Sequence, residues 1–289
     1  MQELIDKASV LQEALPYIRR FHGRVFVIKY GGHAMIDEAL RDGFARDIVL
    51  MKYVGLHPVV VHGGGPQIDE VLQSMGVVSE KLDGLRVTDD RTMEVVEMVL
   101  GGTVNQSIVS LIGAHGGKAI GLTGKDANFL RAKKIEEMRT KSGKLVDPGR
   151  VGIVTDVNPD LVLNLVKEGY IPVISPVAVD ENGRSLNVNA DIAAGRIAEA
   201  LHAQKLLLLT DIDGVRGADG KVASSLSSDE ITALEKAGVI EGGMIPKVEC
   251  ALQALAGGVN KAHIIDGRLK HAVLLEIFTD HGVGTEITR

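Results

Sequence analysis

The chain has 289 residues, of which 45% are hydrophobic and 24% charged, a composition typical of a globular protein with one large domain or two modest ones. Its 32 Lys and Arg residues against 38 Asp and Glu residues give a net charge of -6, and the scattered basic residues argue against a nucleic-acid partner. No uninterrupted apolar run approaches the roughly 20 residues of a membrane span, and the N-terminus lacks a basic-then-apolar signal pattern. We therefore expect a cytoplasmic protein without a membrane partner.

An amphipathic helix is predicted before the first strand. Apolar residues recur there every third or fourth position, at Leu4, Ala8, Leu11, Leu15 and Ile18. The helix is expected to end near Arg20. Because nothing in the following sheet requires it, its apolar face is expected to pack either on its own domain or on a neighbouring subunit.

Short runs rich in Val, Ile and Leu then alternate with stretches of helical period. The runs are residues 24–30, 58–62, 118–122, 171–175, 205–210 and 262–266. Runs that are apolar on both faces and separated by helices indicate a mainly parallel, open sheet covered on both sides, and hence an α/β fold. Between the second and third runs, Thr88 is expected to cap a helix whose first turn carries Asp89 and Asp90.

The region from residue 127 to residue 157 has a different pattern. "FLRAKKI" and "VGIVTDV" are typical of strands, and the turn-rich "KSGKLVDPGR" lies between them, so an inserted antiparallel hairpin is predicted. A domain boundary, if there is one, is expected near "DENGRS", residues 180–185. The single cysteine, Cys250, cannot form an internal disulfide and is expected to be a small core residue.

Glycines gather where the predicted strands end. Lys29 is followed by Gly31 and Gly32, and the second strand by "HGGGPQ", residues 62–67. Ligands bind beyond the carboxyl ends of strands in open parallel sheets, and glycines there allow backbone N–H groups to approach an anion. A phosphate site is therefore predicted. Neither glycine cluster has P-loop or dinucleotide spacing, which disfavours hydride chemistry.

Two lysines and a carboxylate are predicted to meet at this site. Pro246 is expected to open a helix and to place Lys247 in its first turn, where a cation is unfavourable unless an anion is bound. Lysines and glycine-rich loops suit a transferring phosphoryl group. Asp191, near the start of another helix, is either an N-terminal helix charge or, where the two lysines converge, the carboxylate that holds their ammonium groups apart.

Five further polar residues are candidate ligands. Arg86 precedes a helix and is suited to bind a substrate carboxylate. Asn187 and Asn189 alternate on an extended segment, so both are expected to face the same way. Asp211 and Asp213 follow the fifth strand and are candidates to contact a nucleotide or a magnesium ion, although Asp-Gly is also a common turn sequence.

Six motifs in this order resemble the amino-acid kinase family, in the branch that phosphorylates N-acetyl-L-glutamate. They are "IKYGGHAM", "VVVHGGGPQI", "GLRVTD", "LNVNADIAA", "LLTDIDGV" and "GGMIPKVECAL", and they span nearly the whole chain. The resemblance implies a three-layer α/β/α sandwich around a mainly parallel open sheet. It also implies an oligomerisation helix (1–22), an N-terminal lobe (23–180) that binds the acylated amino acid, and a C-terminal lobe (181–289) that binds ATP.

The resemblance also implies site residues and an activity. Lys29 and Lys247 match transition-state-stabilising lysines, and Asp191 the carboxylate that organises them. The substrate-binding positions would be Gly64, Gly65, Arg86, Asn187 and Asn189, and the nucleotide-binding positions Gly31, Gly32, Thr210, Asp211, Asp213 and Gly214. The γ-phosphoryl group of ATP would pass to the side-chain carboxylate of N-acetyl-L-glutamate, the second step of arginine biosynthesis. Mg²⁺ would be held mainly by the nucleotide, with no protein metal site.

Two features resemble the arginine-inhibited members of the family. In these members the N-terminal helix interlaces between dimers to build a hexameric ring, a trimer of dimers. The region "HAVLLEIFTDHGVGTEI" would contribute to a feedback site for L-arginine, where Glu276 is suited to pair with the guanidinium. The residues around arginine would be Tyr17, Lys205, His263, Glu276, Gly282 and Gly284.

Other functions remain open at this point. A sibling kinase could use glutamate, aspartate, carbamate or uridine monophosphate as acceptor, and Arg86 with the two asparagines would discriminate among them. A non-catalytic nucleotide-binding regulator on the same fold would be expected to lose one or both lysines, whereas this chain keeps both. A dehydrogenase is disfavoured because its glycine fingerprint is missing.

Overall fold

The structure, a computed structural model, describes residues 1–82, 85–140, 143–279 and 282–289. The side chains of residues 3, 4, 6 and 7 are also not described. The predicted motif positions that lie outside the described residues are Gly84, Lys141, Ser142, Asp280, His281 and the side chain of Leu4.

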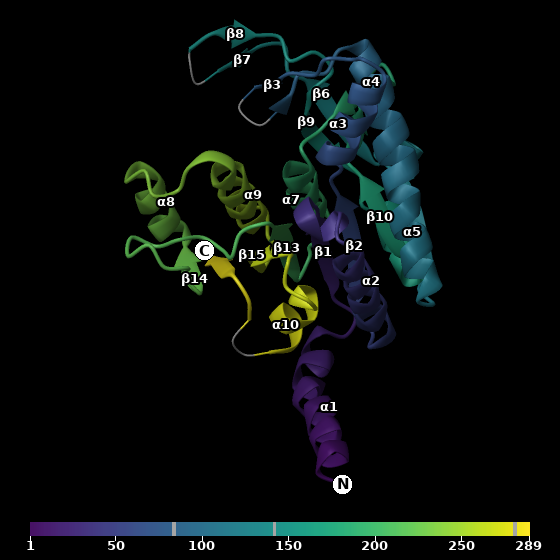
Figure 1. Ribbon diagram of the computed structural model, residues 1–289, viewed down its shortest axis with the longest axis vertical. Helices are drawn as coiled ribbons and strands as arrows, with labels where there is room; N and C mark the ends of the chain where they lie inside the picture. The colour runs from purple at the N-terminus through teal and green to yellow at the C-terminus, as the bar shows by residue number, and fades with distance from the viewer. Residues whose placement is uncertain (83–84, 141–142, 280–281) are drawn as a thin grey trace.

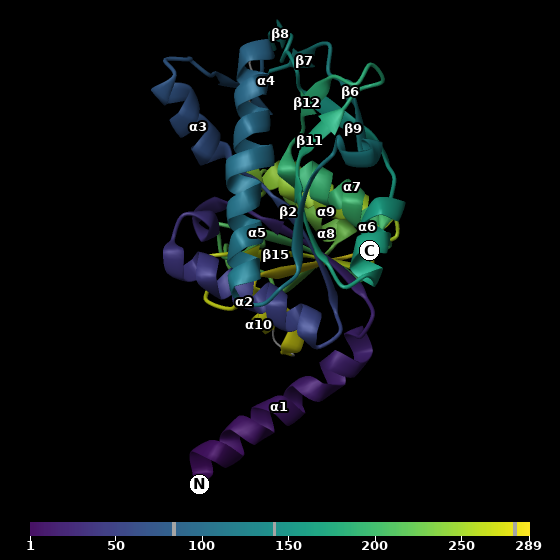
Figure 2. The ribbon, with the colours of Figure 1, turned by 90° about the vertical axis from the view of Figure 1, so that its right-hand side faces the viewer.

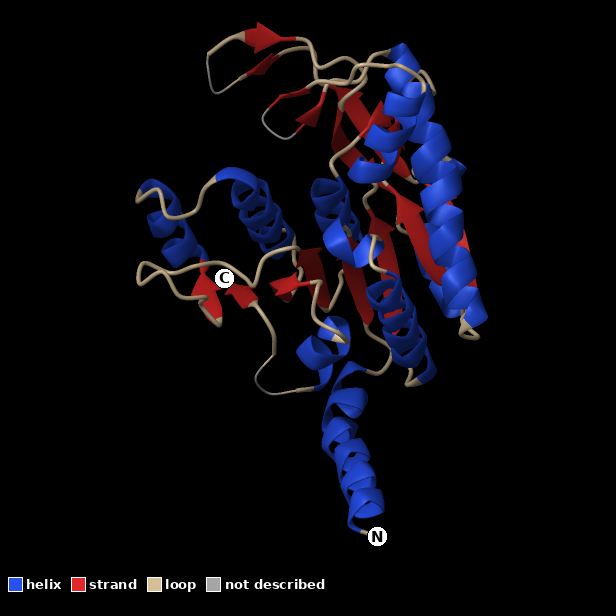
Figure 3. Cartoon of the chain, in the orientation of Figure 1, coloured by secondary structure: helices blue, strands red, loops and turns tan. Residues whose placement is uncertain are grey.

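An eight-stranded sheet forms the centre of the molecule (Figures 1 and 3). Six neighbouring strands are parallel, and they are the six predicted runs. In spatial order they are β5 (Ala119–Thr123), β10 (Ile171–Ser175), β2 (His57–His62), β1 (Val25–Tyr30), β13 (Lys205–Thr210) and β15 (Lys261–Asp266). β16 (Thr285–Thr288) runs antiparallel to β15, and β14 (Ser225–Ser227) pairs with β16 at the edge. The prediction of a mainly parallel open sheet is confirmed.

Helices cover both faces of this sheet. Val27 of β1 packs in one core with α6 (Asp160–Lys167), α7 (Ala190–Ala200), α8 (Ser228–Lys236) and α9 (Ile245–Ala256). Phe26 and Ile28 of the same strand point into a second core. Its helices are α2 (Glu38–Tyr53), α3 (Gly65–Ser74), α4 (Asp90–Glu97), α5 (Asn105–Ala114) and α10 (Ala272–Phe278). This alternation explains why the strand sequences are apolar on both faces, and it confirms the three-layer fold.

A second, four-stranded sheet lies beyond the central one. Its order is β12 (Ser185–Asn187), β11 (Val177–Val179), β6 (Leu130–Lys134) and β9 (Gly152–Val157). β6 and β9 are antiparallel, as predicted for the inserted hairpin, and the short strands β7 (Met138–Arg139) and β8 (Leu145–Val146) extend it. The proposed boundary at residues 180–185 falls in the turn between β11 and β12. Because these two strands pair, β12 belongs with the preceding sheet, and the limits of the lobes stay a prediction.

Helix α1 (Gln2–Phe21) projects from the body, with the N-terminus at its far end (Figures 1 and 2). Leu11 is 73% exposed and Leu15 is 51% exposed, whereas Phe21 in the last turn is buried. The apolar stripe along most of α1 therefore does not pack on its own domain, and only the last turn does.

Two helix starts differ from prediction by one residue. The N-cap of α4 is Asp89, whose carboxylate accepts a hydrogen bond from the Thr92 N–H, while the Thr88 hydroxyl donates to the Arg86 carbonyl instead. Helix α9 begins at Ile245, so Pro246 is its second residue, and Lys247 still lies in the first turn. The first difference arises because Thr88 and the adjacent Asp89 are both suitable N-cap residues, and the second because proline is tolerated throughout the first turn of a helix.

A long helical segment was not anticipated from the apolar runs. Helix α4 continues through a π-helix, η2 (Met98–Val104), into α5, and residues 90–114 are long and apolar enough to cross a membrane by length and composition alone. Small and amide-bearing residues interrupt its apolar runs. Core helices of globular proteins pass the same test, and here α5 packs against α2, β5 and β10.

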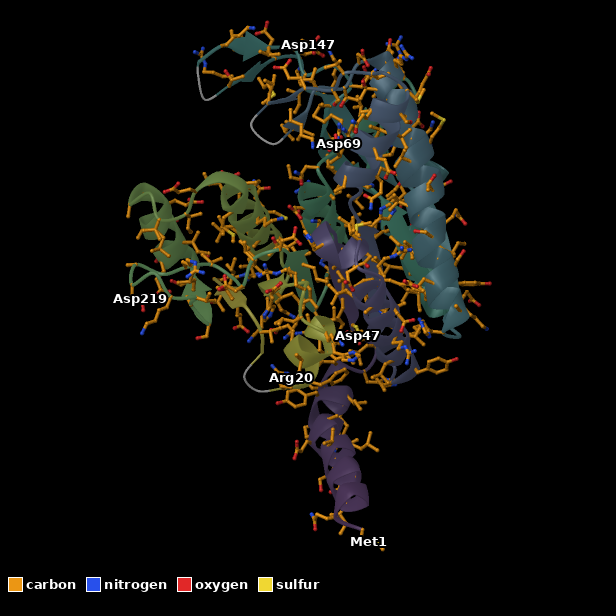
Figure 4. The ribbon with its side chains drawn as sticks, viewed as in Figure 1. Met1, Arg20, Asp47, Asp69, Asp147 and Asp219 are labelled. Atoms are coloured by element: carbon orange, nitrogen blue, oxygen red, sulfur yellow. The ribbon has the colours of Figure 1, made fainter. Side chains whose placement is uncertain are left out.

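One buried carboxylate on α2 predicts an unusual pH dependence of stability. Asp47 is a residue of α2 (Figure 4), and its Oδ1 is 2.7 Å from Nδ1 of His271, the residue that precedes α10. Burial raises the pKa of Asp47 to about 6, and His271 offsets only part of this effect. A raised carboxylate pKa means that folding favours the protonated form, so this contribution to stability is lost as the pH rises through about 6.

We expect Asp47→Asn to increase the free energy of unfolding at pH 8, by on the order of 1–3 kcal/mol, and to give only about half that gain at pH 5, because the carboxyl of the unfolded chain already ionises above about pH 4. The neutral amide removes the cost of a buried charge and can still contact His271. Thermal unfolding at the two pH values measures this. Glu38→Gln, at an exposed position of α2, is the control and should show no such difference. An equal effect of Asp47→Asn at both pH values would contradict the assignment.

Candidate active site

The predicted site residues meet at the edge of the sheet where the parallel strands end. β1 lies between β13 and β2, so the loops that follow these three strands are neighbours. Lys29 is opposite Val61 of β2 and Leu208 of β13, one residue before β1 ends. The helices α7 and α9 pack on each other and bring Asp191 and Lys247 to this edge. Three segments far apart in sequence are thereby joined.

The two lysines bracket one carboxylate, as predicted. Nζ of Lys247 is 2.7 Å from Oδ2 of Asp191, and Nζ of Lys29 is 3.1 Å from Oδ1. The contact with Lys247 is a hydrogen bond. The contact with Lys29 is an ion pair without hydrogen-bond geometry. The side chains are 11% (Lys29), 9% (Asp191) and 15% (Lys247) exposed. We call these three residues the lysine–aspartate cluster.

The protein environment keeps this carboxylate ionised. Burial by itself raises the pKa of Asp191, but the ammonium groups of Lys29 and Lys247 outweigh burial and lower it. Cys250 on α9 lies beneath it, and its Sγ–H donates to the Asp191 carbonyl at 2.9 Å. Burial raises the pKa of Cys250 to about 12, so this thiol is a core group, as predicted, and not a nucleophile.

Gly31 lets Lys29 reach the cluster. A Cβ at this glycine would lie 2.7 Å from Nζ of Lys29, so any larger residue would displace the ammonium group. The next residues form a short 3-10 helix, η1 (Gly32–Met35). Asp211, after β13, closes this turn: its Oδ1 accepts a hydrogen bond from the His33 N–H at 2.6 Å. The loops after β1 and β13 are therefore joined directly.

The glycine loop after β2, residues 63–65, presents donors. Its three carbonyl groups are all occupied: that of Gly63 by Nδ1 of His62 (2.7 Å), that of Gly64 by the Ile68 N–H (3.0 Å), and that of Gly65 by Nη2 of Arg86 (3.2 Å). Among the described residues, the N–H groups of Gly64 and Gly65 have no protein partner. With the N-terminus of α3 beside them, they form an anion-binding loop.

A cavity of about 250 Å³ opens beside this loop. All five residues predicted to bind the acceptor substrate line it, namely Gly64, Gly65, Arg86, Asn187 and Asn189. Arg86 is buried and already has partners: its Nη1 contacts Oδ1 of Asp69 (2.6 Å) and Oγ of Ser79 (2.7 Å). Its Nη2 donates to the Gly65 carbonyl, so the guanidinium is fixed beside the glycine loop.

Some predicted ligands have different surroundings from those expected. Asn189 is the N-cap of α7, and its Oδ1 accepts from the N–H groups of Asp191 and Ile192, so only its amide nitrogen is left for a ligand. Asn187 Nδ2 donates to Oγ1 of Thr88. Asp213 pairs with Arg216 in an exposed turn, and Gly214 is buried against Val222. Thr210 is buried at the end of β13.

The predicted effector residues also come together. A second cavity, of about 290 Å³, is lined by all six of them, namely Tyr17, Lys205, His263, Glu276, Gly282 and Gly284. Glu276 is not free in this structure: its Oε1 is 3.0 Å from Nζ of Lys205 and 2.8 Å from Nδ1 of His263. Burial would raise the pKa of Glu276, but these two partners lower it to about 2. Burial lowers the pKa of His263, so its ring is a neutral donor.

Sequence reasoning missed the residues that support the site. Asp69, on the first turns of α3 (Figure 4), holds both Arg86 and Lys81, with Nζ of Lys81 2.6 Å from its Oδ2. His62 and Asn105 are buried behind the glycine loop. For His62 and Asn105 the sequence signal was a polar residue at an otherwise apolar position, whereas Asp69, whose side chain is 43% exposed, gave no such signal. That signal is weak, because it does not reveal the partner.

Comparison with known proteins gives a family match. The model of the Amino acid kinase family matches residues 24–266. An acetylglutamate kinase from Stutzerimonas stutzeri is 60% identical over 286 residues, which is 97% of this chain and 95% of that protein. An acetylglutamate kinase from Acinetobacter baylyi is 58% identical over 287 residues, 98% of this chain and 95% of that protein.

Solved structures have the same fold. N-acetylglutamate synthase from Neisseria gonorrhoeae, complexed with coenzyme A and N-acetyl-glutamate, matches 98% of this chain with a TM-score of 0.86 and 26% identity. The same protein with coenzyme A and L-arginine matches 97% with a TM-score of 0.81 and 25% identity. This chain spans 63% and 65% of those chains, respectively.

We expect Asp191→Asn to lower the free energy of unfolding at pH 7 by about 3 kcal/mol, because it leaves two nearly buried ammonium groups without a counter-charge. Inorganic phosphate should restore part of the loss by binding between the lysines, and should stabilise the unmodified chain less. Chemical unfolding with and without phosphate measures both effects. Glu97→Gln is the control: it breaks the more exposed pair of Glu97 with Lys125 and should cost less than about 1 kcal/mol. If Asp191→Asn were as stable as the wild type, the electrostatic role assigned to Asp191 in the lysine–aspartate cluster would be wrong.

Proposed function

The chain belongs to the amino acid kinase family, and on this basis we propose that it transfers the γ-phosphoryl group of ATP to the side-chain carboxylate of N-acetyl-L-glutamate. The product is N-acetyl-L-glutamyl 5-phosphate. One observation carries the proposal: two lysines meet on one carboxylate next to a glycine loop with free N–H groups. Names of relatives at 58% and 60% identity over nearly the full length support the choice of acceptor.

The lysine–aspartate cluster performs the electrostatic part of the reaction. The acceptor carboxylate is already ionised, so it attacks phosphorus without a protein base, and the bond from phosphorus to the leaving oxygen of ADP breaks. Lys29 and Lys247 stabilise the negative charge that spreads over the phosphoryl oxygens. Asp191 acts as a positioning residue, because it fixes both ammonium groups at hydrogen-bond or ion-pair distance. No protein nucleophile is required.

The 250 Å³ cavity is the proposed acceptor site. Arg86 and the amide nitrogen of Asn189 lie on its wall and can bind the α-carboxylate and the acyl group, and Asn187 completes it. The glycine loop provides N–H groups for the reacting carboxylate or the phosphoryl group between the two substrates. Holding both reactants at fixed distance is the main source of rate enhancement in such a reaction.

ATP is proposed to bind across the loops after β1 and β13. The residues concerned are Gly31, Gly32, Thr210, Asp211, Asp213 and Gly214. The His33–Asp211 hydrogen bond keeps the two loops together. Among the described residues, no group of three or more His, Cys, Asp or Glu side chains is arranged to hold a metal ion, and Asp191 is committed to the lysines. We propose that magnesium is held mainly by the phosphates of the nucleotide, where it would share their charge with Lys29 and Lys247.

We propose that the 290 Å³ cavity binds L-arginine as a feedback effector. The carboxylates of Glu276 and Glu286 suit a guanidinium or amino group, and Lys205 and Lys261 suit the α-carboxylate. The last turn of α1 lines this cavity through Tyr17, Arg20 and Phe21. We further propose that the exposed apolar stripe of α1 contacts another subunit, in a hexamer built as a trimer of dimers. The enzyme would act in the cytoplasm, at the second step of arginine biosynthesis.

We expect magnesium-dependent ADP release with N-acetyl-L-glutamate, and not with L-glutamate, L-aspartate, carbamate or uridine monophosphate. Lys29→Met should lower kcat by about 100-fold or more, because it removes a charge that acts on the transition state. Lys133→Met, at an exposed position of β6, is the matched control and should retain wild-type turnover. Turnover of a different acceptor would point to a sibling kinase, and no turnover of any acceptor would favour a nucleotide-binding regulator.

We expect millimolar L-arginine to inhibit the full-length chain. Glu276→Gln should weaken that inhibition at least tenfold, because it removes the charge that would meet the guanidinium. Removal of residues 2–16 should convert the hexamer to a smaller species, as measured by light scattering, and should shift the arginine response. The effector proposal fails if arginine has no effect on the full-length chain. The assembly proposal fails if the shortened chain forms the same oligomer as the full-length chain.

A further inference from the structure

We infer that His62 and Asn105 are positioning residues that aim the Gly64 N–H at the reacting groups. This inference rests on the proposed phosphoryl transfer. Neither residue lines the acceptor cavity, and both are almost completely buried, with exposures of 0% and 1%. Their contacts form a chain of hydrogen bonds that runs from the carbonyl of Val173 in β10 to the glycine loop.

This series of hydrogen bonds begins at the Val173 carbonyl oxygen, which can only accept a hydrogen bond. The Val173 carbonyl lies 2.9 Å from Nδ2 of Asn105, which sets the orientation of the Asn105 amide, since its oxygen would repel that carbonyl. The second N–H of the same amide then points to Nε2 of His62, at 3.1 Å. Nε2 must accept, so the neutral ring carries its proton on Nδ1. Nδ1–H donates to the Gly63 carbonyl at 2.7 Å.

The surroundings of the ring favour its neutral form. Burial lowers the pKa of His62 to about 4, so the ring is neutral at physiological pH. The Oδ1 atom of Asn105 has no hydrogen-bond partner, although it is buried. A Cβ at Gly121 would lie 1.9 Å from this atom, so glycine there makes room for the amide. In this orientation the Asn105 oxygen stays without a partner, while both N–H groups of its amide are used, one by the Val173 carbonyl and one by His62. The series of hydrogen bonds to Gly63 requires this orientation.

The direction of the Gly64 N–H follows from peptide geometry. The Gly63 carbonyl and the Gly64 N–H belong to one trans peptide unit and point in opposite directions. His62 draws the carbonyl into the protein, so the N–H points toward the cavity that residues 63–65 line. The Gly63 N–H is held separately by the Tyr30 carbonyl at 2.9 Å. A Cβ at Gly64 would lie 2.5 Å from Cδ2 of Leu100, so the loop also packs too closely for another residue.

Two substitutions at His62 separate this role from general stability. The amide nitrogen of His62→Asn can occupy the place of Nδ1 and donate to the Gly63 carbonyl. The longer side chain of His62→Gln reaches the place of Nε2, so it keeps the Asn105 contact and leaves the Gly63 carbonyl without a donor. Both variants place an amide in the same buried site, and thermal unfolding checks that their folding costs are matched.

We expect His62→Gln to lower kcat/KM for N-acetyl-L-glutamate by about 100-fold, the effect of losing one preorganised donor. His62→Asn should retain activity within about tenfold of wild type, and the KM for ATP should change little in either variant. Equal losses in the two variants would overturn the positioning role, as would a loss that appears only in the KM for ATP.

A measurement that does not depend on activity tests the same chain of hydrogen bonds. The ¹⁵N resonances of the histidine rings distinguish the two neutral tautomers, and His62 is assigned by the signal that disappears in His62→Asn. A ring protonated on Nδ1 supports the inference, whereas one protonated on Nε2 overturns it. If the wild-type chain fails to phosphorylate N-acetyl-L-glutamate, the proposed function is wrong, and the tautomer alone then decides whether the hydrogen bonds exist.

Discussion

The active site depends on one buried carboxylate that is shared by two ammonium groups. Asp191 lies 2.7 Å from Lys247 and 3.1 Å from Lys29, and each of the three residues comes from a different element, namely α7, α9 and β1. Without the carboxylate, two cations would face each other in a site of low dielectric. With it, the two ammonium groups are held at one carboxylate, one beside each oxygen. The packing of α7 and α9 against the sheet is therefore needed to bring the carboxylate to both ammonium groups.

The sheet edge determines what surrounds this cluster. Because β13, β1 and β2 are parallel neighbours, the loop proposed to bind the nucleotide, Lys29 and the glycine loop (residues 63–65) follow one another across the edge. Each loop is held by a side chain from elsewhere: Asp211 holds the turn at His33, and Arg86 and His62 hold carbonyls of residues 63–65. The common feature of these contacts is that each fixes a backbone group at the sheet edge, which is the preorganisation that stabilisation of a transition state requires. The second cavity lies apart, where the last turn of α1 meets β15, α10 and β16.

Much of the fold could be predicted, and the reasons are local. Strands such as residues 205–210 are apolar on both faces, and glycines mark where strands end, so the α/β order and the position of the site followed from short stretches of sequence. Asn189 shows where such reasoning fails: alternation suggested a ligand, but a capping role for the same side chain uses its oxygen. Arg86 was identified as a ligand, but its partner Asp69 was not, since the sequence does not indicate which surfaces pack together.

By itself, the sequence determined the α/β fold class, the parallel strands and the residue types at each strand end. Periodicity and glycine placement act over a few residues, and both are visible in the chain. Only the tertiary structure decided that Asp69 holds Arg86, that the hydrogen bonds of Asn105 set the proton position on His62, and that most of the α1 stripe stays exposed. These facts depend on which elements become neighbours. That choice is made by the packing of two cores on one sheet, to which every element contributes.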